Sequence, residues 1–500
     1  MPSRPWGPGP RSCATVLVLL GLALSCAAPA SADPDGARWT WRVAVSPDLA
    51  TLRVRWEVEG FRPRRAWLGD ASSHDTLTLL PPPDDADGAA TLARADGEPV
   101  ALDVVGVDGD RSCFEYAVDV RKVIEAGAGR RVGGALVLRT GSYLVRAGNV
   151  PDDLDAQLVV DAPTGVRAAF PGEPLGPGRW RVPASQWPFQ GWTVFGAFDL
   201  DRFTCAGCDV TLVRLPGPLA ATSAGVRRWV STAVEADATL FHGRFPRPRL
   251  LVTVEPSPRA TEDVPFGTAW NGGGPHAFLW LSSRARDAAL PGEWVGVHEL
   301  LHTALPHIAL DDAWFAEGFV TYYQEVLRAR SGKNAPAEAW NQLADGFRRG
   351  AASTSTETIA SDSAAMQARH EYRRVYWAGA AIALRLDVAL RRRTGNRASL
   401  DDVMRAITTH PAADRRSLTG DDLRTLLLRW LPDGQGARIV AEVLDARRFP
   451  DLVPTWAFLG VEPEADGVTL RDDAPGVAVR DAIMARFDPV APDAGAASGG

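Results

Sequence analysis

The sequence predicts an α+β protein in which a β-rich, sandwich-like N-terminal domain precedes a mostly helical domain with a small sheet. Three observations support this prediction. The chain has 500 residues, which exceeds the size of one ordinary hydrophobic core. Before about residue 215, apolar residues alternate with polar ones in many short runs, as they do in half-exposed strands. After that point, apolar residues recur at helical spacing.

Changes in composition divide the chain into five predicted segments. These are a signal peptide over 1–32, a β-rich domain over 33–215, a mainly helical domain over 216–446, a C-terminal extension over 447–484 and a disordered tail over 485–500. The tail is rich in Ala, Gly, Pro and Asp, and such a composition buries too little apolar surface to fold.

The first residues have the pattern of a secretory signal. Two arginines begin it, an apolar run follows over 14–24, and small residues at 30–32 offer a cleavage site that leaves Asp33 as the mature N-terminus. The apolar run is too short for a stable bilayer anchor. We therefore expect an exported protein, periplasmic or extracellular. Lipidation at Cys26 and an uncleaved anchor are the alternatives.

The overall composition is that of a globular protein, with 46% hydrophobic and 23% charged residues. The net charge of −7 is spread along the chain without a long basic block, which argues against nucleic acid as a partner. No later segment has about eighteen unbroken apolar residues. We therefore expect no transmembrane segment in the mature chain.

No catalytic or metal-binding residues are predicted in the first half of the chain. Strands are expected at 39–45 and 52–58, between turns rich in Pro, Gly and Asp. Cys205 and Cys208 have the spacing of a redox pair, but no second pair completes a four-cysteine zinc site. A disulfide is the expected state in an oxidising compartment, which leaves one thiol over among Cys113, Cys205 and Cys208. His74 is expected on the surface.

From about residue 216 the pattern is mainly helical. A helix is predicted over 220–242, and short strands are predicted at 250–254 and 276–281. The further helices run to residue 305, where Pro306 stops the first, then over 312–330, 364–393, from a capping Ser399 onward, 419–431 and 435–446.

The most informative segment is His-Glu-Leu-Leu-His over 298–302. Histidines four residues apart on a helix lie on one face, so His298 and His302 can reach one metal ion. Glu299 can instead reach a water at that metal. Two imidazoles and a carboxylate on a buried face are costly without such a partner. A chance match, or two histidines satisfied by hydrogen bonds in a core, are the alternatives.

A catalytic zinc needs a third protein ligand and an open position. Glu317 stands near the start of an amphipathic helix among aromatic residues, and a metal would offset the cost of burying it. His307 is the competing candidate, but it follows Pro306 closely and is expected to point away. We predict one zinc ion, held by His298, His302 and Glu317.

These motifs resemble those of the gluzincin peptidases. Within that group the similarity is to the glycyl aminopeptidase family, and more distantly to the alanyl aminopeptidase and leukotriene hydrolase group. The shared pattern is the histidine pair followed by Asp-x-Trp-x-x-Glu-Gly-Phe over 312–319 and Tyr-x-x-Gly over 376–379. The resemblance covers about residues 220 to 445 and implies a thermolysin-like catalytic domain.

The resemblance also implies a role for individual residues. Glu317 maps to the third zinc ligand, and Asp312 maps to a group that orients a ligating histidine. Tyr376 maps to the tyrosine whose hydroxyl stabilises the oxyanion. Tyr372, one turn earlier, is the competing tyrosine, and His370 is expected to be solvated.

The sequence departs from the family in two places. The loop between His302 and Glu317 is shorter than in the alanyl aminopeptidase group. The exopeptidases also carry Gly-x-x-Glu on a strand before the zinc helix, and its glutamate binds the free amine of the substrate. The matching segment here begins at Gly267 and has Trp270 in place of the acid, while Glu262 and Asp263 lie off register.

We therefore predict an exported zinc metallopeptidase that hydrolyses peptide bonds, with a zinc-activated water and Glu299 as the general base. The expected activity is aminopeptidase-like, on peptide or protein substrates. The missing amine-binding acid makes an endopeptidase or an amidase for unusual substrates the first alternative. A catalytically weak zinc-fold binding protein is the second, although a purely structural metal would not need Glu299.

Overall fold

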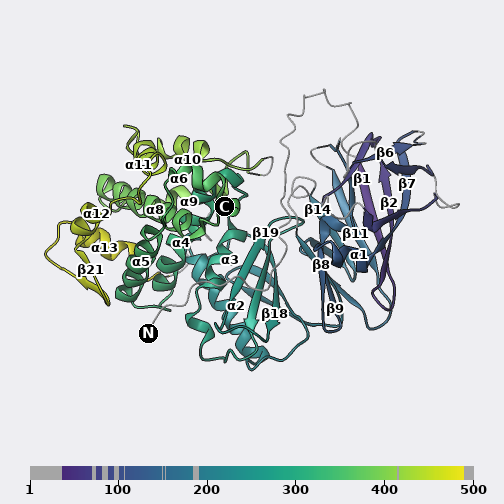
Figure 1. The fold of residues 1–500 in the computed structure, drawn as a ribbon, viewed down its shortest axis with the longest axis horizontal. Coiled ribbons are helices and arrows are strands. Elements are labelled where there is room, and N and C mark those ends of the chain that lie inside the picture. The colour runs from purple at the N-terminus through teal and green to yellow at the C-terminus, as the bar shows by residue number, and fades with distance from the viewer. Residues whose placement is uncertain are drawn as a thin grey trace, which may run out of the picture. The chain divides into compact units, whose positions relative to one another are not determined.

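The computed structural model describes residues 37–488, except 70–74, 82–87, 95–100, 106, 108, 149, 152–153, 184–190 and 414–415. The predicted signal peptide, His74 and most of the predicted tail lie outside the described residues. The chain divides into two compact units, one ending at Asp199 and including Gly272–Gly274, the other holding the remaining residues (Figure 1). The first unit is rich in strands and the second is mostly helical, so the predicted α+β class is confirmed.

Short strands build the described part of the first unit, which also holds the helix α1 at Val120–Glu125 and a 3₁₀ turn, η3, at Thr140–Ser142. The strands are β1 Arg38–Val45, β2 Thr51–Glu59, β3 Arg65–Leu68, β4 Leu77–Leu79, β5 Thr91–Arg94, β6 Ala101–Val105, β7 Arg111–Asp119, β8 Gly129–Val132, β9 Ala135–Arg139, β10 Val145–Ala147, β11 Asp155–Asp161, β12 Arg167–Ala169, β13 Glu173–Gly176, β14 Arg179–Pro183 and β15 Trp192–Gly196. They form three sheets, with the orders β13-β14-β11-β1-β2-β7-β4, β10-β3-β6-β5 and β12-β15-β9-β8.

The alternating pattern of the sequence sets which side chains enter the core of this unit. In the antiparallel pair β1–β2, Trp41 lies opposite Trp56, and both indoles are fully buried. Side chains two residues apart share a face of a strand, so one face of β1 and one face of β2 are apolar. Trp56, Leu68 and Leu138, from three different sheets, belong to one hydrophobic core. A shared core between sheets is the sandwich-like arrangement that the sequence predicts.

The second unit contains a five-stranded sheet and a small hairpin. The strands are β16 Asp199–Cys205, β17 Cys208–Arg214, β18 Arg249–Ser257, β19 Phe266–Trp270, β20 His276–Ser282, β21 Val461–Glu464 and β22 Gly467–Leu470. The large sheet has the order β16-β17-β18-β20-β19, and the hairpin pairs β21 with β22. Strands β17, β18 and β20 are parallel, whereas β19 runs antiparallel to β20 along one edge.

Helices make up the rest of the second unit. They are α2 Ser223–Ala238, α3 Val295–Ala304, α4 Ala313–Arg330, α5 Pro336–Ala351, α6 Ile359–Ala364, α7 Met366–Arg369, α8 Tyr372–Thr394, α9 Leu400–Thr408, α10 Gly420–Leu427, α11 Gln435–Leu444, α12 Val453–Leu459 and α13 Val477–Met484, with the short turns η5 Thr239–Phe241, η6 Leu290–Gly292 and η7 Leu310–Asp312. Leu279 of the sheet, Trp229 of α2 and Leu300 of α3 share one core, so α2 and α3 cover one face of the sheet (Figure 1).

The units divide at Asp199, earlier than the change near residue 215 in the sequence. Strands β16 and β17 look like the strands before them, but β17 pairs in parallel with β18 and so joins the sheet of the second unit. An alternating pattern identifies a strand but not the sheet it joins. Cys205 and Cys208 flank the turn between these strands, and both are buried free thiols, as is Cys113. The expected disulfide is therefore not formed in this structure.

The helix predicted over 364–393 is broken near its start. The structure has two short helices, α6 and α7, before α8 begins at Tyr372, because His370 takes a left-handed backbone conformation with φ of 58°. The predicted extension over 447–484 is ordered: Leu459 of α12 and Ile483 of α13 are buried in the core of the second unit.

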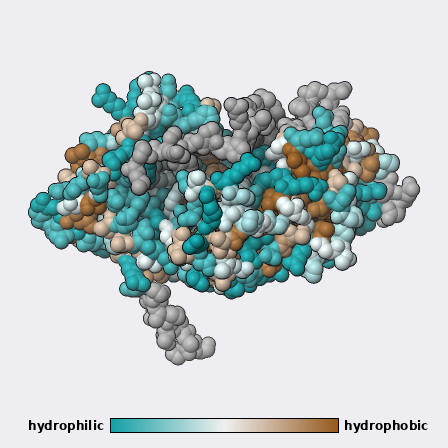
Figure 2. Space-filling view, turned by 60° about the horizontal axis from the view of Figure 1, so that its bottom comes forward, coloured by the Kyte–Doolittle hydropathy of each residue, from teal (hydrophilic) through white to brown (hydrophobic). Residues whose placement is uncertain are grey.

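Figure 2 shows one face of the molecule, on which hydrophilic residues predominate and hydrophobic residues gather in small groups. Within the described residues, no helix combines the length and the apolar character needed to cross a bilayer.

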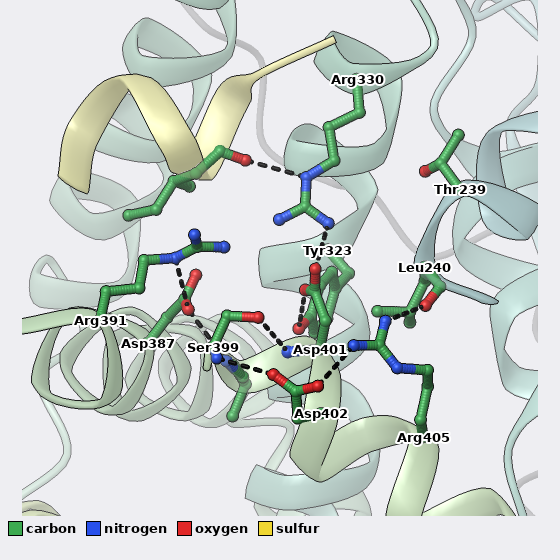
Figure 3. A network of polar contacts seen from close by, with 12 residues as sticks. Thr239, Leu240, Tyr323, Arg330, Asp387, Arg391, Ser399, Asp401, Asp402 and Arg405 are labelled. Carbon is green, nitrogen blue, oxygen red and sulfur yellow. Dashed lines mark hydrogen bonds and ion pairs between the residues drawn. The ribbon is translucent and has the colours of Figure 1, made fainter. Parts of the chain in front are cut away.

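A buried polar network joins α4, α8 and α9 (Figure 3). Asp387 of α8 accepts hydrogen bonds from Arg391 Nε at 2.9 Å, Tyr322 Oη at 2.8 Å and the backbone N–H of Leu400 at 2.9 Å. Arg330 of α4 pairs with Asp401 of α9 at 2.9 Å and also donates to the backbone carbonyl of Ile483 in α13. Two arginines and two carboxylates thus balance each other and fix four helices in place.

Replacing Asp387 with Ala should destabilise the second unit strongly. The change leaves the buried Arg391 without its ion pair, and breaking such a buried pair typically costs about 3–5 kcal/mol. Urea unfolding followed by circular dichroism measures this loss. Asp433→Ala is the matched control, since its pair with Arg393 is largely exposed and worth less than about 1 kcal/mol. Equal shifts for the two variants would contradict a stabilising network.

Candidate metal centre

Helix α3 is mostly buried, and its two histidines lie on one face. Val297, Leu300 and Leu301 lie in the core of the second unit, and these apolar contacts hold the helix against the sheet. The helix ends at Leu305, whose extended backbone is the conformation favoured before a proline. His298 and His302 project from the same face, one turn apart.

Three ligand atoms from α3 and α4 meet at one point. Glu317 Oε2 lies 3.4 Å from His298 Nε2 and 3.2 Å from His302 Nε2, and the two Nε2 atoms are 3.3 Å apart. The sequence predicts these three residues as one set, and the structure brings them together. His298, His302 and Glu317 form a group able to hold a metal ion, identified within the described residues.

The geometry and charges of this group suit a small divalent cation. Burial opposes ionisation of Glu317, but the two facing imidazoles and their hydrogen bonds hold the pKa of its carboxyl well below its usual range. The group therefore offers one anionic oxygen and two imidazole nitrogens. That donor set is typical of zinc sites that keep one open position.

Glu299 lies beside the group on the same helix. Burial raises the pKa of its carboxyl to about 7, while His298 lowers it and Glu317 raises it. Gly267 of β19 faces this side chain: a Cβ atom there would lie 2.4 Å from Glu299 Cγ and 2.8 Å from Val295 Cγ1. The glycine on the edge strand thus leaves the space that Glu299 occupies.

Tyr376 of α8 also reaches this group. Its ring stacks on the His298 imidazole, with ring centroids 6.2 Å apart and planes 14° from parallel. Burial, the charges of Glu317 and Glu299, and a hydrogen bond with the Glu317 side chain raise the pKa of the Tyr376 phenol far above its usual value. The competing Tyr372 is 39% exposed and contacts the ring of His370 instead.

Two glycines explain how Glu317 and Tyr376 come so close. A Cβ atom on Gly318 would lie 2.3 Å from Gly379 Cα, and one on Gly379 would lie 1.9 Å from the Trp314 carbonyl oxygen. The backbones of α4 and α8 are therefore in contact at this crossing. Each glycine follows a site residue within one helical turn, which accounts for glycine in both the Glu-Gly and the Tyr-x-x-Gly patterns.

Two other residues singled out in the sequence have different partners. The Asp312 carboxylate accepts from Trp314 Nε1 and from the backbone N–H of Gly420, each at 2.9 Å. It therefore anchors the start of α10 and does not orient a histidine as the resemblance implies. His307 lies outside the ligand group, with Nδ1 2.8 Å from the Ser417 hydroxyl.

The residue that contacts the outer nitrogen of a candidate ligand is Gln324, which the sequence analysis missed. Its Oε1 lies 2.8 Å from His298 Nδ1. Gln324 follows Glu317 by seven residues, about two turns of α4, so both lie on the face that meets α3. That spacing is the signal from which it could have been found.

A family model described as M61 glycyl aminopeptidase matches residues 307–382. The match contains Glu317 and Tyr376 and begins after the histidine pair. The chain resembles the M61 glycyl aminopeptidases. The resemblance inferred from the motifs is therefore confirmed, and the match indicates a peptide hydrolase. A search of curated protein sequences finds no match to the chain.

Solved structures share the fold. An aminopeptidase N family protein from Idiomarina loihiensis has a TM-score of 0.63 at 16% identity, over 85% of this chain and 78% of that one. A variant M1 zinc metallopeptidase from Deinococcus radiodurans, bound to a Tyr-Ser-Ala substrate, has a TM-score of 0.52 at 16% identity, over 83% and 95%. Native yeast LTA4 hydrolase has a TM-score of 0.50 at 12% identity, over 89% and 70%. These similarities show a common two-unit fold.

The space at Gly267 yields a prediction about stability. In Gly267→Ala the new methyl group meets Glu299 and Val295, and overpacking of this kind costs about 1–3 kcal/mol. Thermal unfolding checks the loss, and a crystal structure of the variant should show Glu299 displaced. Gly292→Ala serves as the control, because a Cβ atom there meets nothing within 4 Å. An unshifted melting temperature in Gly267→Ala would contradict the close contact.

Proposed function

We propose that the protein is an exported, aminopeptidase-like zinc peptidase in which His298, His302 and Glu317 hold one zinc ion and Glu299 is the general base. The observation that carries this proposal is the convergence of three ligand atoms from two helices beside the partly buried carboxylate of Glu299. The predicted signal peptide supports export. The M61 match supports a peptide as the substrate.

The separations between the ligand atoms support zinc. A tetrahedral site with bonds of about 2.0–2.1 Å has edges of about 3.3–3.4 Å. The three separations here are 3.2, 3.3 and 3.4 Å, so the residues already fit such a site. When bound, zinc supplies a Lewis acid that acidifies water and polarises a carbonyl group.

Glu299 is suited to move the proton in this reaction. Its side chain is partly buried next to the ligand group, and the loss of solvation raises the pKa of its carboxyl to about 7, which suits it to accept and release a proton near neutral pH. Glu299 accepts the proton of the attacking water and donates it to the nitrogen of the leaving amine. Its position one residue from His298 would place it beside a water at the metal, while the ligand group of His298, His302 and Glu317 does not include it.

Tyr376 is suited to stabilise the oxyanion. Its phenol stays protonated, because burial and two carboxylates disfavour the phenolate, so it remains a hydrogen-bond donor. The Gly318–Gly379 crossing fixes α8 close to the ligand group. A preorganised donor of this kind is typically worth about 3 kcal/mol in the transition state.

A second candidate function, endopeptidase, is favoured by Trp270. This residue occupies the position at which the related exopeptidases carry the acid that binds the substrate amine. In the structure it ends β19, opposite His276, with ring centroids 6.4 Å apart. An indole cannot form an ion pair with an ammonium group. Strand β19 is the edge of the described sheet, so an extended substrate can add along it at either side of the scissile bond.

Digestion of a peptide mixture tests the function and separates the two candidates. The zinc-loaded mature protein should cleave peptides, and a chelator should abolish cleavage. Sequential loss of N-terminal residues identifies an aminopeptidase, whereas internal cuts identify an endopeptidase; mass spectrometry of the products distinguishes them. Glu299→Gln should retain zinc and lower turnover by about 10²–10⁴-fold. Glu317→Ala should lose zinc. No cleavage by the zinc-loaded protein would leave a binding role only.

A separate prediction concerns Tyr376. In Tyr376→Phe the ring still packs on His298, but the hydroxyl donor is gone. We expect kcat to fall about 10²–10³-fold with KM nearly unchanged, because the interaction forms only in the transition state. Steady-state kinetics on a peptide cleaved by the parent protein checks this split. Tyr372→Phe is the matched control, and normal turnover in Tyr376→Phe would assign the donor to another group.

A further inference from the structure

A chain of buried polar contacts leads away from His298 along α4. His298, Gln324, Glu325 and Arg328 are each less than 9% exposed. Gln324 Oε1 contacts His298 Nδ1 at 2.8 Å, and Gln324 Nε2 donates to Glu325 Oε1 at 3.0 Å. Arg328 Nη1 donates to the other oxygen of Glu325 at 2.7 Å. The chain thus ends on a cation.

The ion pair fixes the orientation of the Gln324 amide. The Arg328 guanidinium keeps its charge, and loss of the Glu325 charge would leave that cation buried without a partner. Burial raises the pKa of Glu325, and Arg328 is the foremost influence opposing that shift. As a carboxylate, Glu325 can only accept a hydrogen bond, so it must face the amide nitrogen of Gln324. The amide oxygen therefore faces His298.

The amide orientation in turn fixes the histidine tautomer. An amide oxygen can only accept, so His298 Nδ1 must carry the proton. The Nε2 atom of a neutral His298 then has a free lone pair, and Nε2 is the atom that faces Glu317 Oε2 and His302 Nε2. The charge of Arg328 thus determines, through Glu325 and Gln324, which nitrogen of His298 carries the proton and which has the free lone pair.

Arg328 also connects α4 to the start of α3. Its Nη2 donates to the Gly292 carbonyl at 2.5 Å, three residues before α3 begins. Gln324 and Arg328 are one turn apart on α4, so they contact α3 at His298 and just before its N-terminus. These two contacts restrict rotation and sliding of α3 against α4, and thereby the position of the His298 ring.

We propose that Gln324, held by Glu325 and Arg328, is a positioning residue that keeps His298 in the Nδ1–H tautomer and so strengthens metal binding. The proposal rests on the zinc site of the proposed function. Unlike a carboxylate in this place, the amide adds no charge to the ligand group, so Glu317 remains its one anionic ligand. Outer partners of zinc ligands of this kind change metal affinity by about 10–100-fold when removed.

Two substitutions separate positioning from simple packing. Gln324→Met keeps the approximate volume but removes the acceptor, whereas Gln324→Glu keeps an acceptor and adds a buried charge. If Gln324 positions His298, Gln324→Met should weaken zinc binding about 10–100-fold, and Gln324→Glu should bind within about tenfold of the parent. If Gln324 only fills space, Met should be tolerated better than Glu, which would overturn the proposal. Gln342→Met, a similar change on the exposed side of α5, should leave affinity unchanged.

The readouts are zinc affinity by chelator competition and ¹⁵N NMR of labelled histidines in the metal-free protein. The chain has only eight histidines, and the His298 signals are identified by their loss in His298→Ala. With the imidazole in its neutral form, the parent and Gln324→Glu should show the proton of His298 on Nδ1, and Gln324→Met should not. A neutral His298 that keeps its proton on Nδ1 in Gln324→Met would overturn the proposal. Because the tautomer is read without metal or substrate, this test is independent of whether the protein proves to be a peptidase.

Discussion

The backbone contact between α4 and α8 is the constraint on which the candidate site depends. At Gly318 and Gly379 the two helices approach until no side chain fits between them. This crossing brings Glu317 and Tyr376, from segments about sixty residues apart, to the same group of atoms. A wider crossing would separate the tyrosine hydroxyl from the carboxylate. The chemistry proposed for this centre therefore requires glycine, which has no side chain, at both positions.

Helix α4 carries several buried polar side chains, and many of them contact different neighbouring elements. Glu317 and Gln324 face α3, Tyr323 and Arg330 face α9 (Figure 3), and Glu325 with Arg328 lies between the histidine and the turn before α3. Buried charges are expensive unless they are paired, so each pair also specifies one arrangement of the neighbouring helices. This arrangement holds the side chains of the site in fixed positions, because a shift of any one helix would leave a charge without its partner.

The parts of the site that depend on local spacing could be predicted from the sequence, and those that depend on tertiary contact could not. The histidine pair follows from a helical period, and Glu317 and Tyr376 follow from patterns that resemble a known family. Asp312 was misassigned, since its two oxygens go to Trp314 and to the start of α10, a contact across about a hundred residues. Gln324 was missed because a glutamine in a helix has no distinctive pattern until its partner is known. The boundary between the units also differs from the predicted one because it depends on tertiary contact. The alternating pattern of β17 does not reveal that this strand pairs with β18.

A shift in the strand register of β19 could not bring an acidic residue to the position of Trp270. The strand and the residue after it are held against α3 at two points. Gly267 lies against Glu299, and the Asn271 side chain donates to the Leu305 carbonyl at 3.1 Å, just beyond the end of α3. A slip by one residue would place a Cβ atom against Glu299 and turn every side chain of the strand to its other face. Glu262 and Asp263 therefore cannot slide into the place of the missing acid. The same two contacts that place Glu299 beside the candidate ligand group also hold an indole at the position where the related exopeptidases carry an acid, so this position offers an ammonium group no ion pair.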